Sequence, residues 1–182
     1  DIDVVLLDAQ DDGIAQIGHY LDGRSGLESI HIISHGKPGT LYLGSTVLSN
    51  GSLENYADVL ARIGQALAAT GDILLYGCNV GAGEVGTTFI TRIAELTSAD
   101  VAASVDQTGA ATRGGNWSLE VTTGLIEADI VSTAAGIVAW DGVLSGGVIT
   151  TAIGSSLDAA YSVALQPDGK ILVGGTSFTD SG

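Results

Sequence analysis

Short apolar runs alternate with amphipathic stretches along the first two-thirds of this 182-residue chain. Continuous apolar runs predict buried strands, because a strand that is covered on both faces shows no polar alternation. Such runs lie at residues 4–7, 30–33, 73–76 and 101–103. Apolar residues on either side of Gly44 and Ser45 also predict a tight hairpin, with strands at 41–43 and 46–48.

Between these runs, apolar residues recur at helical spacing. The first predicted helix follows a cap at Asp11 or Asp12 and ends at Gly23. The second follows a cap at Ser52 and ends at Gly71, and a third covers residues 86–96. Strands that alternate with helices predict an α/β fold with a mainly parallel central sheet and helices on both faces.

The pattern changes near Asp141. Before it, residues 117–121 alternate like a half-exposed strand, and 137–140 resemble a last strand. We predict one domain over residues 1–141, a Gly-rich linker over 142–154, and a strand-turn-strand region over 155–182. The tail has strands near 163–165 and 171–173 around a turn at 167–169, and one such unit cannot bury its own face.

Composition narrows the possible functions. Apolar residues make up 45% of the chain, which indicates a globular protein. The net charge of −15, with only six Lys and Arg residues, excludes binding to nucleic acid or to anionic lipid. No apolar run is long enough to insert in a membrane. A single cysteine gives neither an internal disulfide nor a zinc cluster.

The chain has no methionine and opens beside an apolar run. We therefore expect it to be a fragment of a longer protein. Its acidic, Gly-rich and Lys-poor composition suits a secreted bacterial protein.

Two motifs place reactive residues at the ends of predicted strands: His-Ile-Ile-Ser-His-Gly at 31–36 and Leu-Leu-Tyr-Gly-Cys at 74–78. Sites in parallel sheets form at the carboxyl ends of strands, which is where His35 and Cys78 fall. A thiol and an imidazole are the minimum for nucleophilic catalysis. We expect the loop to expose the sulfur and the helix after it to favour the thiolate. The alternative is a buried cysteine and a structural histidine.

The neighbouring residues extend this hypothesis. Gly36 leaves its amide open to close approach, so it can stabilise an oxyanion. Asp106 follows the fourth strand, either as a solvated loop residue or as a pocket wall that selects a basic side chain. Arg113 is a nearby cation and would instead select an acidic side chain.

Residues 81–86 match the G-x-G-x-x-G pattern of dinucleotide sites. Four residues separate this pattern from Tyr76, and the strand before it is not the first of the sheet, so we predict no nucleotide cofactor. The glycines instead favour a loop that lets a substrate approach the backbone. No twelve-residue calcium-loop pattern occurs, so no metal ligand is assigned, although calcium binding by acidic loops stays open.

A strand that ends in His-Gly and a later strand that ends in Gly-Cys resemble the caspase-like cysteine peptidases, which include caspases, gingipains, legumains, CHAT domains and toxin self-processing domains. Residues 4–125 also resemble an uncharacterised bacterial domain family near the start of very large secreted, adhesin-like repeat proteins. The matching phrases lie at 12–17, 34–36, 74–78, 102–104 and 114–120. The tail resembles one bacterial delta repeat.

The resemblance implies a caspase-like three-layer sandwich. His35 would be the general base and acid, and Cys78 the nucleophile. The amides of Gly36 and Cys78 would form the oxyanion hole, while Ser104 and Asp106 would border the pocket for the residue before the cut. No cofactor and no third catalytic residue are implied.

The function that follows is a cysteine endopeptidase of the secreted or cell-surface space, with a polypeptide as its substrate. That substrate includes its own chain, in which residues 142–147 are the nearest accessible target. The alternative is a non-catalytic scaffold or adhesion module with this fold, which binds calcium through its acidic loops.

Overall fold

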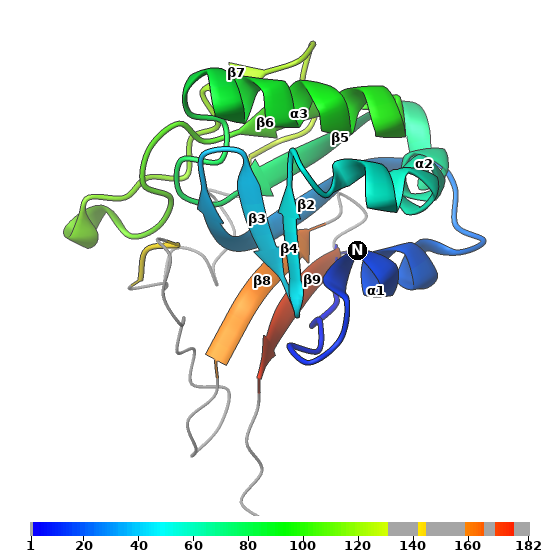
Figure 1. Cartoon of the computed structure of the whole chain (residues 1–182), viewed down its shortest axis with the longest axis horizontal. Coiled ribbons are helices and arrows are strands. Elements are labelled where there is room, and N and C mark those ends of the chain that lie inside the picture. Colours follow the sequence, from blue (N-terminus) through cyan, green and yellow to red (C-terminus); the bar gives the residue numbers. More distant parts are fainter. Residues whose placement is uncertain (1, 131–141, 145–158, 166–169, 177–182) are drawn as a thin grey trace, which may run out of the picture.

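A computed structural model describes residues 2–130, 142–144, 159–165 and 170–176 (Figure 1). Its helices are α1 (Gly13–Leu21), η1 (Leu53–Tyr56), α2 (Ala57–Ala66), α3 (Gly83–Thr97) and η2 (Ala111–Arg113), where η marks a 3-10 helix. Its strands are β1 (Ile2–Val4), β2 (Leu27–Lys37), β3 (Thr40–Leu43), β4 (Thr46–Ser49), β5 (Leu67–Tyr76), β6 (Asp100–Ala103), β7 (Val121–Thr122), β8 (Ala159–Leu165) and β9 (Lys170–Thr176). The fold is therefore mixed α/β.

The sheet runs in the order β1-β9-β8-β2-β5-β6-β7, and β3 and β4 branch from β2. In the described part of the chain, only the pairs β2–β5, β5–β6 and β1–β9 are parallel, and the other five pairs are antiparallel. The prediction of a mainly parallel sheet is therefore wrong. Helices α2 and α3 return the chain for the parallel strands β5 and β6, whereas the hairpins need only short loops and pair antiparallel.

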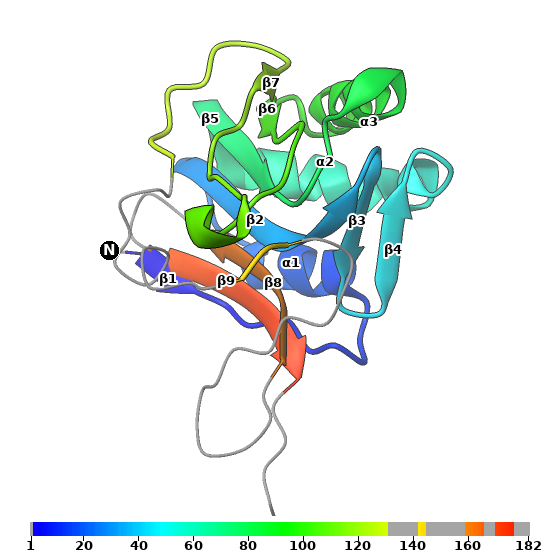
Figure 2. The same ribbon diagram turned by 90° about the vertical axis from the view of Figure 1, so that its left-hand side faces the viewer.

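The central strands have two unlike faces (Figure 2). On the first, which we call the helix face, alternate residues of β2, β5 and β6 pack with all three α-helices of the described chain. The residues of the strands on this face are Ile30, Ile32, Ile73, Leu75, Val101 and Ala103. The prediction of helices on both faces is thus wrong for the described residues.

The opposite face, which we call the loop face, carries a separate apolar cluster. Its strand residues are Ile33, Leu74, Tyr76 and Ala102, joined by Cys78 directly after β5. Irregular chain after β6 covers them, through Trp117, Leu119, Ile126 and Ala128, together with Leu144 from the predicted linker. One sheet therefore has helices on one side and loops on the other.

Two local predictions are confirmed. The Asp12 carboxylate caps α1 by accepting hydrogen bonds from the N–H groups of Ile14 and Ala15, each at 3.0 Å. Strands β3 and β4 form the predicted hairpin, with Gly44 at a φ of 58° in its turn.

The second predicted helix differs at both ends. The Ser52 hydroxyl caps no helix, because it accepts from the N–H of Ser49 and donates to the carbonyl of Val47. Helix α2 ends at Ala66 rather than at Gly71, since Leu67 is already extended and begins β5.

The chain ends also differ from the expectation. The run at 4–7 is mostly irregular, and β1 stops at Val4 and pairs with β9. The tail strands β8 and β9 form a hairpin, and β8 pairs with β2, so both belong to the same sheet. Of the stretch at 117–121, only Val121 lies in a strand. The strand predicted at 137–140 and most of the predicted linker lie outside the described residues.

Candidate active site

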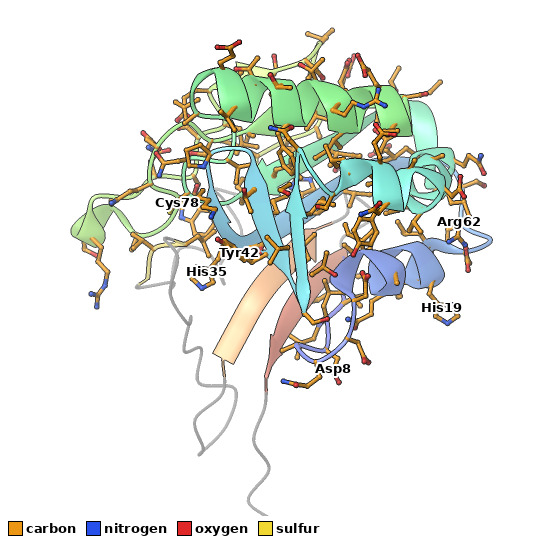
Figure 3. All side chains as sticks on the ribbon, in the orientation of Figure 1. Asp8, His19, His35, Tyr42, Arg62 and Cys78 are labelled. Carbon is orange, nitrogen blue, oxygen red and sulfur yellow. The ribbon has the colours of Figure 1, made fainter. Side chains whose placement is uncertain are left out.

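The parallel pairing of β2 with β5 brings His35 and Cys78 to one end of the sheet. The last registered pair is Ile33 with Tyr76, and His35 and Cys78 each lie two residues further along. Cys78 belongs to the loop-face cluster, and alternation along β2 puts His35 on the same side as Ile33. A Cβ at Gly77 would approach the carbonyl oxygen of Ser34 to 2.9 Å, so the two strand ends are in close contact. Figure 3 shows both side chains at this end of the molecule.

Both side chains are buried. His35 is 5% exposed and Cys78 is 1% exposed, so the prediction that the loop exposes the sulfur is wrong. The N–H of Thr108 donates to Cys78 Sγ at 3.3 Å. Burial raises the pKa of the Cys78 thiol, and the backbone N–H groups of Thr108 and Leu144 lower it by less. The thiol form is therefore favoured here, contrary to the expected thiolate.

A three-residue segment lies beside the sulfur. This segment, Gly142–Leu144, which we call the docked segment, pairs antiparallel with residues 108–110 through the bridge between Gly109 and Val143. The Ala110 N–H donates to the Gly142 carbonyl at 2.7 Å, and the Leu144 N–H donates to the Thr108 carbonyl at 2.8 Å. In Figure 2 it is the short yellow stretch beside the green loop that carries η2.

The docked segment also reaches the end of β2. The Gly36 N–H donates to the carbonyl oxygen of Leu144 at 3.4 Å. The Leu144 side chain is 1% exposed and packs in the apolar cluster of the loop face that contains Cys78. One residue thus places its carbonyl on the amide of Gly36, its N–H near the sulfur, and its side chain in the apolar cluster.

Glycine is required at two of these positions. A Cβ at Gly36 would overlap the side chain of Val80, and a Cβ at Gly109 would overlap the carbonyl oxygen of Gly142. Gly109 also has a φ of 140°, which other residues rarely adopt. The bare backbone at these positions lets the chain segments approach one another.

Ser104 and Asp106 lie in the loop after β6, next to the Cys78 turn. The buried Ser104 hydroxyl donates to the Asp106 carbonyl at 3.2 Å, and the Asn79 N–H donates to the same oxygen at 2.7 Å. The Asp106 carboxylate accepts from the Asn116 amide at 2.9 and 3.0 Å. These contacts brace the loop. Arg113 lies exposed in η2.

In a comparison with protein families, residues 1–144 match the model of a domain of unknown function, DUF4347. The chain belongs to the DUF4347 family. No curated protein and no solved structure matches it significantly. The residues that match this family include the ends of β2 and β5, the loop after β6 and the docked segment.

Sequence reasoning missed two residues of this site in the DUF4347 domain, Thr108 and Leu144. Thr108 contributes through its backbone and Leu144 has no reactive group, so no catalytic pattern marks them. The apolar pair Val143 and Leu144 inside a Gly-rich stretch is the one signal in the sequence, because a solvated linker has no need of two adjacent large apolar residues.

The glycines at 81–86 serve packing within the DUF4347 domain. A Cβ at Gly81 would overlap Val121, and a Cβ at Gly86 would overlap Gly81 itself. The Gly81 N–H donates to the Ser104 carbonyl at 2.9 Å. The backbone of this loop therefore packs closely against other parts of the chain. The sequence had instead favoured a loop that lets a substrate approach the backbone.

Two features of the described residues bear on ligands and membranes. Within the described ranges, no three His, Cys, Asp or Glu side chains come together in a way that would hold a metal ion. None of the helices described in the DUF4347 domain is both long enough and apolar enough to span a bilayer.

Proposed function

We propose that this DUF4347 domain is a cysteine endopeptidase that cuts its own polypeptide. The observation that carries the proposal is the shared position of His35 and Cys78 at the ends of adjacent parallel strands, where alternation along β2 puts His35 on the same face as Cys78. In this proposal, His35 moves protons as general base and acid, and Cys78 is the nucleophile.

The backbone around the dyad supports the same chemistry. The Gly36 N–H points at a peptide carbonyl, as an oxyanion donor does. A polypeptide segment already lies along the loop at 108–110 beside the sulfur, so peptide substrates have a place to bind. The order of strand, His-Gly, strand and Gly-Cys supports a caspase-like relationship. The proposal also places the domain in a secreted bacterial repeat protein.

One observation favours the second candidate, a non-catalytic scaffold or adhesion module. The Cys78 thiol is buried and its pKa is raised, as expected for a structural cysteine. The two candidates differ in whether the thiol reacts with a peptide carbonyl.

The test follows the full chain by intact mass spectrometry after purification, with and without calcium. We expect defined fragments from the wild type and a whole chain from Cys78→Ala and from His35→Ala. His19→Ala is the matched control, because the His19 side chain is 91% exposed on α1, and it should behave as the wild type. Identical fragments from Cys78→Ala, or a wild-type chain that stays whole in both conditions, would contradict the peptidase.

A further inference from the structure

We propose that the bond after Leu144 is the bond that is cut, and that the site selects a leucine-sized apolar side chain before the cut. The docked segment is then the acyl side of the substrate, held in place by the chain to which it belongs. This inference rests on the proposed peptidase function and names its substrate class.

The backbone of the docked segment is bound as an extended peptide. Its pairing with residues 108–110 supplies two hydrogen bonds, at 2.7 and 2.8 Å, which do not depend on side chains. Addition of a strand in this way is a general mode of peptide recognition. The bonds fix the register, so that Leu144 and no other residue of the segment has its carbonyl on the Gly36 amide.

The side chain of Leu144 defines the specificity. It is 1% exposed and packs in a cluster formed by Ile33, Leu74, Tyr76, Cys78 and Ala102. A charged side chain in this cluster would lose its hydration without gaining a partner. A basic side chain before the cut, selected by Asp106, does not fit this site, because the Asp106 carboxylate already accepts hydrogen bonds from the Asn116 amide.

Only glycine at position 109 leaves room for the docked segment. Any side chain at this position would overlap the Gly142 carbonyl oxygen, and its φ of 140° already disfavours other residues. A residue larger than glycine here would displace the docked segment without replacing Cys78, His35 or Gly36.

The reaction balances with water as the only co-reactant. Cys78 Sγ transfers its proton to His35 and attacks the carbonyl carbon of Leu144, while the Gly36 N–H stabilises the oxyanion. The bond from this carbon to the nitrogen of Ser145 breaks, and His35 gives its proton to that nitrogen. Water then attacks the thioester, which restores the Cys78 thiol and leaves Leu144 with a terminal carboxylate.

The same arrangement accounts for the buried sulfur. Leu144 packs in the cluster that contains Cys78, so departure of the docked segment would uncover Sγ. We therefore expect the thiol to be shielded while the segment is docked and to react once it is displaced.

The first test maps the ends of the fragments by mass spectrometry. We expect one fragment that ends at Leu144 and another that begins at Ser145. Leu144→Lys should slow the cut at least about 100-fold, whereas Leu144→Met should stay within about tenfold of the wild type, because the apolar shape is kept. Leu125→Lys is the control, since Leu125 is 73% exposed, and its rate should equal that of the wild type.

The outcomes separate the two proposals. Cys78-dependent fragments that end at another residue, or a Leu144→Lys chain that is cut as fast as the wild type, would overturn this inference and leave the peptidase standing. A wild-type chain that gives no Cys78-dependent fragments would overturn the peptidase, and this inference with it.

The second test needs no turnover. In a His35→Ala background, which keeps the chain whole, iodoacetamide should alkylate Cys78 at least about tenfold faster when Gly109→Ala or Leu144→Lys is added. Circular dichroism confirms that each variant is folded. Equal alkylation rates in folded variants would show that the docked segment does not cover the sulfur and would overturn the inference.

Discussion

The two faces of the central strands use alternate residues of the same sequence for different purposes. The helix face is an apolar core that all three α-helices of the described residues help to form. The loop face holds His31, Tyr76 and Cys78 among apolar neighbours, under irregular chain. Packed helices contribute stability through apolar area removed from water, whereas the covering loops combine the apolar contacts of a few side chains with a few backbone hydrogen bonds. His35 and Cys78 lie on the face that irregular chain covers.

The cover of the loop face has identifiable anchors. The buried Asp72 carboxylate on β5 accepts hydrogen bonds from the N–H groups of Glu127 and Ala128 at 2.8 and 2.9 Å. The Asn116 amide binds the Asp106 carboxylate further along. These contacts hold the irregular chain over the sheet in place of packed helices.

The largest loss of stability is expected from a substitution on the helix face. Phe89 on α3 is 0% exposed, so Phe89→Ala should lower the free energy of unfolding by about 3–5 kcal/mol. Urea denaturation measures this change, and Val85→Ala on an exposed position of α3 is the control. A loss below about 1 kcal/mol would mean that this face is not the stable core.

The next effect is the acid sensitivity of the loop face. Burial lowers the pKa of His31 to about 4, with Ser29 Oγ 2.7 Å from Nε2 and the Tyr76 ring stacked at 5.9 Å. The unfolded chain therefore binds a proton more tightly than the folded chain does. The contribution of neutral His31 to the free energy of unfolding is complete above about pH 6.5, and it falls by about 3 kcal/mol as the pH drops to 4.

Urea denaturation at several pH values checks this dependence against His31→Gln, which does not titrate. The difference in the free energy of unfolding between wild type and variant should shift by that amount over the same range. A constant difference would show that His31 is solvated rather than buried.

A smaller effect is expected at the Asp72 anchor. Asp72→Ala removes two hydrogen bonds, each with a net contribution of about 1 kcal/mol, and should cost about 2 kcal/mol. Hydrogen exchange should quicken at the amides of Glu127 and Ala128 and stay unchanged in α3. Asp58→Ala, at an exposed position of α2, serves as the control. Equal exchange in Asp72→Ala and wild type would contradict the role of this anchor.

The smallest effect is expected at the sulfur. Cys78→Ala removes one buried sulfur, which accepts a hydrogen bond from the Thr108 N–H at 3.3 Å and donates a weak one to the Thr108 carbonyl at 3.7 Å, so the free energy of unfolding should fall by about 1 kcal/mol. Thermal and urea denaturation measure it. A loss as large as that of Phe89→Ala would erase the distinction between the two faces and assign Cys78 to a structural core.

Much of the fold followed from local pattern. Asp12 caps α1 because a carboxylate before an amphipathic run satisfies free N–H groups, and the hairpin at Gly44 follows from turn chemistry. The boundary at Leu67 was missed, because helical periodicity continues into a strand that only pairing with β2 defines. The antiparallel additions to the sheet were missed for the same reason, since pairing partners are not local.

The sequence by itself determined the candidate chemistry: a lone thiol and an imidazole at the ends of two apolar runs, and a glycine after the imidazole. Those are local facts of residue type and spacing. The tertiary structure alone decided that the sulfur is buried, that helices cover one face, and that Leu144 contributes to the site. Burial and backbone pairing depend on segments far apart in the chain, so no local pattern of residues encodes them.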